Sequence, residues 1–587
     1  MPQDKPNAYW LRVWPPVDGG LFFALRETLC GSYTPRHLRA DLLAGLVVGL
    51  VATPLSMALA IASGAPPQHG LYTAIVAGAL TALLGGSRTQ VTGPTAAFVI
   101  IIAPITAQYG LGGLFVATAL AGIMLAVMGT LRLGRLIEFM PYPVTIGFTA
   151  GIAIVIAFMQ LKDLLGLSVE AWPETFTERI TTLIVFLPSA RLSEVIVGSV
   201  TLVILMFWPK VSRRIPGPLV ALGAVSTGVA WVTARFPEWS VATINSRFTY
   251  IADGVIRHGI PQTPPSFALP WNFPGPEGRP FELSLEVIEA LLPAAFAIAA
   301  LSAIESLLSA VIADGMTGKK HNPDSELKGL GFANIITSFF GGFAATGAIA
   351  RTATNIRAGA CSPFASITHA VFILGVILSL APLLGYVPMS AMAALLLVVA
   401  WNMAEARHVV YMVKVAPRAD TVVLFTCLTL TVVFNMVIAV VAGFIMAALL
   451  FIRRMSDLTE VKLVGHHELE FAEELPAGIV VYEIAGPFFF GSAQKAVSVI
   501  TGVSSGVKVV VLDLREASAM DATGMVNLEF AISKLGAAKV GVILAGVRPH
   551  PLDTIRRSRL REEEGKLLIC ESFEDAIASA RVWAGAK

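Results

Sequence analysis

Two apolar stretches of this 587-residue chain are interrupted at the same dipeptide, Thr-Gly. The first interruption is Thr92-Gly93-Pro94-Thr95, and the second covers residues 345–351. A helix that begins inside a membrane presents unpaired N–H groups and a partial positive charge to whatever lies before it. Two such helix starts facing one point would bind an anion. Paired interrupted spans in the two halves of a transporter are the best sequence indication of a substrate site near the bilayer midplane.

The residues predicted to bind the anion lie at these two breaks and in the first span. Thr92-Gly93-Pro94 has the sequence of a helix start, a capping residue followed by proline; an ordinary Gly-Pro kink is the alternative. Arg351 lies one turn into the second half-helix, where a guanidinium could hold a carboxylate or a sulfate. The predicted set is Ser56, Met57, Thr92, Gly93, Pro94, Thr95, Gly347, Ala348, Ile349, Ala350 and Arg351.

Glu305 is the only acid deep within a long apolar run, residues 286–313. An acid inside the membrane is costly when charged and is by default a functional candidate. Its carboxyl could carry a proton and release it when water reaches it from one side, which would suit a proton-coupled symporter. The alternative is a permanent ion pair with Arg351. For Ser56 and Met57, which follow Pro54 in mid-membrane, the alternative is packing around a kink.

The composition indicates a protein that is dissolved mainly in lipid. Hydrophobic residues make up 55% of the chain and charged residues 14%, against about 25% charged residues in soluble domains. The net charge of +2 does not suggest a nucleic-acid partner, and four scattered cysteines indicate neither a disulfide framework nor a metal site. The His466-His467 pair has no metal-ligand partner at a useful spacing. No phosphate-binding loop or nucleophile–base pair stands out, so neither a cofactor nor an enzymatic activity is expected.

Fourteen apolar runs between residues 42 and 452 predict a polytopic α-helical membrane protein. Thr92 and Thr346 are 254 residues apart, and the same offset relates the first span to the eighth, which contains Glu305. Seven spans, an odd number, make up each half, so we predict a seven-plus-seven inverted repeat with half-helices at spans 3 and 10. Basic residues in alternate loops place these loops and both termini in the cytoplasm; they are Arg36, Arg39, Arg88, Arg132, Arg135, Lys210, Arg213, Arg214, Lys319, Lys320, Lys328, Arg407, Lys414, Arg418, Arg453 and Arg454.

Three regions follow from these patterns. They are a cytoplasmic N-terminal segment over residues 1–40, in which no signal peptide is expected, a transport domain over 41–455 and a C-terminal domain over 456–587. In the last region, strand-like runs at 478–484, 507–514, 540–545 and 567–570 alternate with helix-like runs at 492–503, 521–535 and 573–583. This alternation predicts a small cytoplasmic α/β domain with a partly parallel sheet.

Several motifs together resemble the signature of the SulP (sulfate permease) family of anion transporters. They are Pro54-x-x-Met57-Ala58, Pro67-x-x-Gly70-Leu71-Tyr72, Gly85-Gly86-Ser87-Arg88 and Thr92-Gly93-Pro94-Thr95. The C-terminal region resembles the STAS domain of that family, with Leu512-Asp513-Leu514 and Met520-Asp521-Ala522-Thr523-Gly524. The resemblance implies core and gate subdomains that move as an elevator, a homodimer, and a substrate held between the third and tenth half-helices.

Finer features of the resemblance bear on substrate and coupling. Residues 303–308 and 347–360 most resemble the bacterial aerobic C4-dicarboxylate transporters. Sodium-using relatives are similar but have Asp where this chain has Glu305, which favours protons here. Many relatives have Gln where Leu55 stands, so that contact is not carried over. Thr523 occupies the position of the serine that is phosphorylated in soluble STAS relatives.

These observations predict a secondary active transporter in a bacterial inner membrane. It would bring C4-dicarboxylates (succinate, fumarate or aspartate) into the cell with protons. Sulfate or another inorganic oxyanion, such as bicarbonate or nitrate, is the alternative substrate by symport or exchange, because the same donors fit either ligand. An anion channel and a STAS-linked sensor are alternatives of another class. The expected partners are the anion, protons, membrane lipid and a second copy of the chain.

Overall fold

The structure is a computed structural model that describes residues 20–585 except 136–139, 170–172, 174–175, 213–214, 253, 435, 458–459, 465–475, 490–496 and 498–505. The helix predicted over 492–503 falls outside the described residues apart from position 497, and so do His466-His467 and residues 1–19 of the N-terminal segment. The chain forms two compact units, Met1–Phe444 and Ile445–Lys587. The following paragraphs describe each unit by itself.

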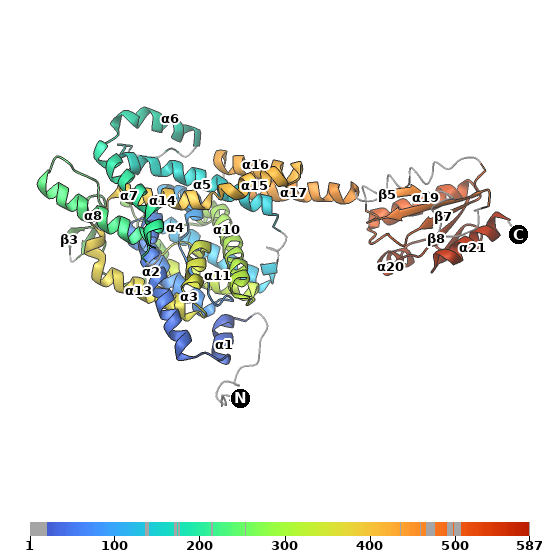
Figure 1. Cartoon of the computed structure of the whole chain (residues 1–587), viewed down its shortest axis with the longest axis horizontal. Helices are drawn as coiled ribbons and strands as arrows, with labels where there is room; N and C mark the ends of the chain where they lie inside the picture. Colours follow the sequence, from blue (N-terminus) through green and yellow to red (C-terminus); the bar gives the residue numbers. More distant parts are fainter. Residues whose placement is uncertain are drawn as a thin grey trace. The chain divides into compact units, whose positions relative to one another are not determined.

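The first unit is a bundle of α-helices (Figure 1). Its helices up to the long connection over residues 236–284 are α1 Phe23–Cys30, α2 Pro35–Ala62, α3 Pro67–Leu84, α4 Val99–Thr130, α5 Tyr142–Leu165, α6 Phe176–Phe186, α7 Leu192–Val211 and α8 Gly217–Arg235. After this connection come α10 Leu285–Thr317, α11 Pro323–Phe339, α12 Ile349–Arg357, α13 Phe364–Leu384, α14 Met389–Met403, α15 Ala406–Val415, α16 Arg418–Val433 and α17 Met436–Asp457. The residues of α17 from Ile445 onward belong to the second unit. Between the helices lie the short strands β1 Thr92–Gly93, β2 Thr249–Ala252, β3 Val255–His258 and β4 Thr346–Gly347, the helical turn α9 Ile244–Arg247, and several 3₁₀ turns, of which Ala96–Phe98 leads into α4.

Nine helices in the described part of the chain are long and apolar enough to cross a membrane. One of them, Ala96–Thr130, contains both the predicted third and fourth spans, which are separated by a non-helical residue, Gly110, with φ 67°. Glycine alone adopts this backbone conformation without steric cost. The chain is therefore a polytopic membrane protein, and the count of 14 spans stays a prediction.

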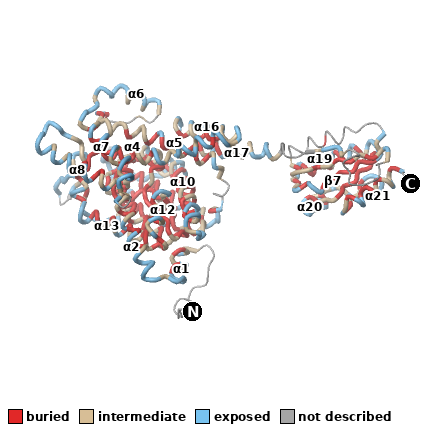
Figure 2. Tube along the Cα trace, in the orientation of Figure 1, coloured by how far each residue is buried: buried red, intermediate tan, exposed pale blue. Residues whose placement is uncertain are grey.

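Close packing of the inner helices depends on small residues. α4 packs along α11, and α2 packs along α13. A Cβ on Gly331 would lie 2.5 Å from the backbone nitrogen of Ala126, and a Cβ on Gly122 would lie 2.7 Å from the carbonyl oxygen of Gly331. Such contacts between backbones are how membrane helices associate without a hydrophobic driving force between them. Buried residues accordingly gather around α4, α10 and α12, at the centre of the bundle (Figure 2).

Asp41 joins the start of α2 to the turn between α12 and α13. Its carboxylate is completely buried and accepts hydrogen bonds from Tyr33 Oη at 2.7 Å, from the N–H of Cys361 at 2.8 Å and from the N–H of Ser362 at 3.2 Å. The hydroxyl of Ser362 donates to it as well. A buried carboxylate needs this many donors to offset its desolvation. Asp41 therefore fixes α2 against the end of the second half-helix.

The second unit contains the predicted α/β domain. Its strands are β5 Glu460–Leu463, β6 Ile479–Ala485, β7 Val509–Asp513, β8 Gly541–Ala545 and β9 Leu567–Cys570, and its helices are α19 Ala522–Ala537, α20 Pro549–Arg557 and α21 Phe573–Ala584. The strands form one sheet in sequence order; β5 is antiparallel to β6 and the others are parallel. Four predicted strands and two predicted helices are confirmed, whereas β5 and α20 were not predicted.

We predict that Cys361 reacts slowly with maleimide at pH 7, although the residue is only half-buried. Burial, helped by the Asp41 carboxylate, raises the pKa of the Cys361 thiol to about 11. The reactive thiolate is therefore scarce at neutral pH. Single-cysteine variants that retain Cys361 or the exposed Cys30 allow a direct comparison of labelling rates. Asp41→Asn should accelerate the labelling of Cys361 and leave that of Cys30 unchanged. Equal labelling rates at the two cysteines in the unaltered background would contradict the raised pKa of the Cys361 thiol.

Candidate anion-binding site

The two Thr-Gly breaks meet in space and pair as antiparallel strands. Thr92 of β1 lies opposite Gly347 of β4, and Gly93 lies opposite Thr346. The pairing continues through the N–H of Ala348, which donates to the carbonyl of Val91 at 3.0 Å. Backbone groups at the middle of a membrane protein must be satisfied within the protein. The bridge does this for the residues that precede both half-helices.

Both half-helices begin about two residues later than the sequence predicts. The first begins at Ala96 with Thr95 as its N-cap, so Pro94 is not the first helical residue; the second begins at Ile349 with Ala348 as its N-cap. The reason is that the Thr-Gly pairs are used as strands and not as caps. Neither N-cap side chain bonds to its own helix. The first N–H groups of both helices therefore lack a side-chain partner and remain suited to an anion.

Arg351 lies in the first turn of α12 and is 3% exposed. Its Nη2 donates to the carbonyl oxygen of Pro94, in the other break. Its Nε and Nη1 are buried and have no hydrogen-bond partner. A Cβ on Gly93 would lie 2.6 Å from Nη1, so only glycine leaves room for the guanidinium there. Unmatched N–H donors of a buried charge are expensive, and an anion in front of them would satisfy them.

Glu305 lies across from these groups on α10. Its Oε2 accepts a hydrogen bond from Thr95 Oγ1 at 2.9 Å. Glu305 and Arg351 attract each other electrostatically, yet no ion pair within 4.0 Å joins these two residues, both of which the structure describes. The permanent ion pair that competed with the functional interpretation is therefore not the arrangement found. The two charges are close enough to influence each other and far enough apart to leave Nε and Nη1 of Arg351 without a partner.

The helix starts are accessible from outside the protein. Ile349 is 38% exposed and Ala350 is also exposed, while Thr95, Glu305 and Ala348 are half-buried. These exposures contrast with the buried residues that surround α12 in Figure 2. The site is thus a polar, accessible place within an otherwise tightly packed bundle.

Ser56 and Met57 are not brought to the helix starts by any hydrogen bond or ring contact in the described structure. The Ser56 hydroxyl is buried without a partner, and its backbone carbonyl lies against Gly70 of α3. Met57 lines an apolar cavity of about 510 Å³ between α2, α8 and α13. Their role in substrate binding stays a prediction.

The sequence did not reveal the side chains that bind the residues directly before β1. Gln90 Nε2 donates to Ser306 Oγ at 2.6 Å, and the N–H of Val91 donates to Thr352 Oγ1 at 3.1 Å. His369 of α13 is fully buried, interacts electrostatically with Arg351, and has no partner on either ring nitrogen. The one available signal was their position in the sequence, because Thr352 follows Arg351 and Gln90 lies two residues before Thr92.

The bundle, the paired breaks and the buried arginine with unmatched donors define a membrane transporter for anions. Residues 38–427 match the sulfate permease family and residues 472–576 match the STAS domain. The chain belongs to the sulfate permease family and carries its C-terminal STAS domain. It is a secondary anion transporter of that family and not an enzyme.

Relatives and solved structures agree with this assignment. The "Putative sulfate transporter YvdB" of Bacillus subtilis is 38% identical over 91% of this chain and 96% of its own length. The bicarbonate transporter BicA of Picosynechococcus is 28% identical over 93% of this chain and 95% of its own length. The structure named SLC26A9 has a TM-score of 0.81 at 17% identity, covering 96% of this chain and 93% of its own. The last comparison shows the fold alone. The bacterial relatives point to the cytoplasmic membrane.

We predict that Gly347→Ala raises the half-saturation concentration for the transported anion by about tenfold. The new methyl group would overlap the Gln90 amide, which is held by Ser306, and overpacking of this kind typically costs about 1–3 kcal/mol. Gly375→Ala is the matched control, because a Cβ there would meet nothing within 4 Å. Uptake of the labelled anion into proteoliposomes measures the half-saturation concentration of both variants. Equal affinities in the two variants would show that the strand pairing does not set the site.

Proposed function

We propose that this protein carries an inorganic oxyanion, sulfate or bicarbonate, across the cytoplasmic membrane. The support comes from two sources. Relatives that match this chain over nearly its whole length are named as sulfate and bicarbonate transporters, and at the helix starts Nε and Nη1 of Arg351 have no acceptor within the protein. This proposal corrects the emphasis of the sequence analysis, which placed C4-dicarboxylates first.

The single observation that carries the proposal is the buried Arg351 with two unmatched N–H donors. A planar guanidinium binds two oxygens of one anion in a fork. The uncapped starts of the two half-helices add N–H groups from both sides of the β1–β4 bridge. A compact oxyanion presents oxygens in several directions and would satisfy both sets of donors at once.

Glu305 is proposed as the proton-carrying group of a symporter. Its hydrogen bond from Thr95 connects it to the N-cap of the first half-helix. When protonated, Glu305 would leave the positive charge of Arg351 available to the anion; when ionised, it would compete with the anion for that charge. Binding of proton and anion would then favour each other, which is the requirement for symport.

An elevator motion of a seven-plus-seven inverted repeat is proposed for the transport step. The helix packing is symmetric under exchange of the halves: α2 packs on α13 as α10 packs on α4. In the predicted numbering of the spans, α2 is span 1 and α13 is span 11, while α10 is span 8 and α4 contains span 4. The homodimer and the cytoplasmic position of both termini also belong to the proposal, as does phosphorylation of Thr523, which is exposed in the first turn of α19.

C4-dicarboxylates remain the second candidate, because residues 303–308 and 347–360 resemble the transporters of those substrates. A dicarboxylate would use the same guanidinium for one of its carboxylates. Its second carboxylate would need a further donor, and the described residues at the helix starts include no second buried arginine or lysine. This difference favours the smaller anion.

We predict saturable uptake of labelled sulfate by the purified protein in proteoliposomes. Excess unlabelled sulfate or bicarbonate should suppress it, and succinate should compete at least tenfold less well. Uptake of succinate without uptake of sulfate or bicarbonate would contradict the proposal and show that the protein transports dicarboxylates. Flux that follows voltage without saturating would indicate a channel, and binding without uptake would indicate a sensor.

We predict that an inward proton gradient stimulates this uptake and that Glu305→Gln abolishes the stimulation. Glutamine keeps the hydrogen bond from Thr95 but cannot gain or lose a proton. Glu289→Gln, at an exposed acid near the start of the same helix, should respond to the gradient like the unaltered protein. Normal stimulation in Glu305→Gln would remove Glu305 from the coupling mechanism.

A further inference from the structure

Glu326 is a buried acid of the transport unit that has no part in the transport step proposed above. It lies in the first turn of α11 and is 1% exposed. Its neighbour Asp324 occupies the same turn. Burial distinguishes Glu326, since a buried carboxylate is retained only where its hydrogen bonds offset the cost of desolvation.

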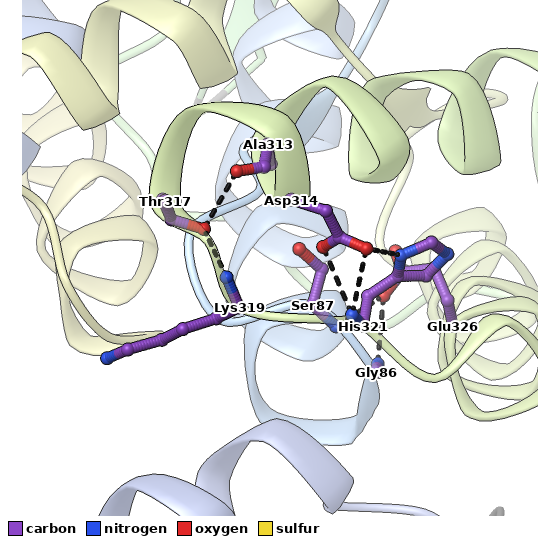
Figure 3. A network of polar contacts seen from close by, with 8 residues as sticks. All are labelled: Gly86, Ser87, Ala313, Asp314, Thr317, Lys319, His321 and Glu326. Atoms are coloured by element: carbon purple, nitrogen blue, oxygen red, sulfur yellow. Dashed lines mark hydrogen bonds and ion pairs between the residues drawn. The ribbon is translucent and has the colours of Figure 1, made fainter.

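The hydrogen bonds of Glu326 go to the segment that leads from α3 to the anion site. Its Oε2 accepts from the N–H of Gly86 at 2.8 Å and from the N–H of Ser87 at 3.0 Å. A Cβ on Gly86 would overlap the carbonyl of Asn322, so the segment lies directly on the start of α11. Figure 3 shows Gly86 and Ser87 beside the Glu326 carboxylate.

The other carboxylate oxygen connects Glu326 to the site through two side chains. Ser306 Oγ donates to Glu326 Oε1 at 3.2 Å and accepts from Gln90 Nε2 at 2.6 Å. Gln90 lies against Gly347 of β4, and Ser306 is the residue next to Glu305 on α10. One carboxylate therefore holds the start of the segment directly and its end through a hydrogen-bonded chain.

The ring of His321, in the turn between α10 and α11, lies beside Glu326 (Figure 3). His321 is held in turn by Asp314, whose Oδ2 lies 2.8 Å from the ring Nδ1 and whose carboxylate accepts the N–H of His321 (Figure 3). These contacts fix the ring next to Glu326 without a direct hydrogen bond between the two.

We propose that Glu326 is a positioning residue of the anion site: it sets the place of segment 86–91, and thereby of the β1–β4 bridge, through Gly86, Ser87 and the Ser306–Gln90 pair. It touches no anion itself. A binding site keeps its geometry only when the groups around it fix its members to within about 0.5 Å. The inference takes the anion site of the proposed function as given.

Glu326→Gln tests this inference with little change in shape. The amide keeps one acceptor oxygen but can no longer accept from both Ser306 and the two N–H groups as a charged carboxylate does. We expect the half-saturation concentration for sulfate to rise about tenfold while the maximal rate per folded protein changes less than twofold. A purely structural role would instead lower the amount of active protein and its thermal stability at unchanged affinity, and that result would overturn the inference.

Asp324→Asn is the matched control, because Asp324 is an acid in the same helical turn. Its Oδ1 accepts a hydrogen bond at 3.0 Å from the N–H of Gly134, which lies between α4 and α5 and not in segment 86–91. We expect its sulfate affinity to be unchanged. A tenfold loss of affinity in this control as well would mean that any charge removed from the turn has the same effect, and would contradict a specific role for Glu326.

A double-mutant cycle tests the connection through Ser306. Ser306→Ala should weaken sulfate affinity, and Glu326→Gln/Ser306→Ala should be no weaker than the worse single variant, because both changes break one chain of hydrogen bonds. Fully additive losses would show that Glu326 does not act through Ser306. If the unaltered protein takes up no sulfate but does take up succinate, the proposed substrate fails, and the same variants measured with succinate still decide the role of Glu326.

Discussion

The antiparallel bridge between Thr92-Gly93 and Thr346-Gly347 is the interaction on which the rest of the transport unit depends. It lets two helices begin in the interior of a membrane protein, where an unpaired backbone has no water to bond to. Because the strands are only two residues long, each helix start follows within a turn and both face the same place. Both glycines are required sterically, since Gly93 faces the Arg351 guanidinium and Gly347 faces the Gln90 amide.

The charges at this bridge are arranged to be incomplete without a ligand. Arg351 has one hydrogen bond, to Pro94, and two N–H donors with none, while Glu305 is bonded to Thr95. A closed Arg351–Glu305 pair would have satisfied both side chains and left the site inert. Glu305 instead lies on α10 and is bonded to the N-cap of the first half-helix, while Arg351 lies on the second half-helix, so Nε and Nη1 of Arg351 have no partner within the protein.

The sequence was sufficient for the membrane character of the chain, the paired breaks, the α/β domain and the family, because each rests on a local pattern such as apolar length or strand–helix alternation. It placed the half-helix starts two residues early, because Thr-Gly-Pro also reads as a cap and proline start; the strand role of Thr92 depends on Thr346, 254 residues away. Glu326 was not identified from the sequence for a similar reason. An acid in a first helical turn is usually solvated, and only its contact with Gly86 and Ser87, 240 residues earlier, shows that it is buried.

The two segments that lead into β1 and β4 are held by side chains of opposite hydrogen-bonding chemistry. Glu326, in the first turn of α11, accepts the N–H groups of Gly86 and Ser87, whereas His69, in the first turn of α3, bonds through Nδ1 to the carbonyl of Gly341 at 2.6 Å. A carbonyl can only accept, so His69 must donate from Nδ1. With the offset of 254 residues between the two Thr-Gly breaks, Ser87 corresponds to Gly341. The segment that precedes β1 is thus held by α11, and the segment that precedes β4 is held by α3, so each strand is tied through hydrogen bonds to a helix from the other end of the transport unit's sequence.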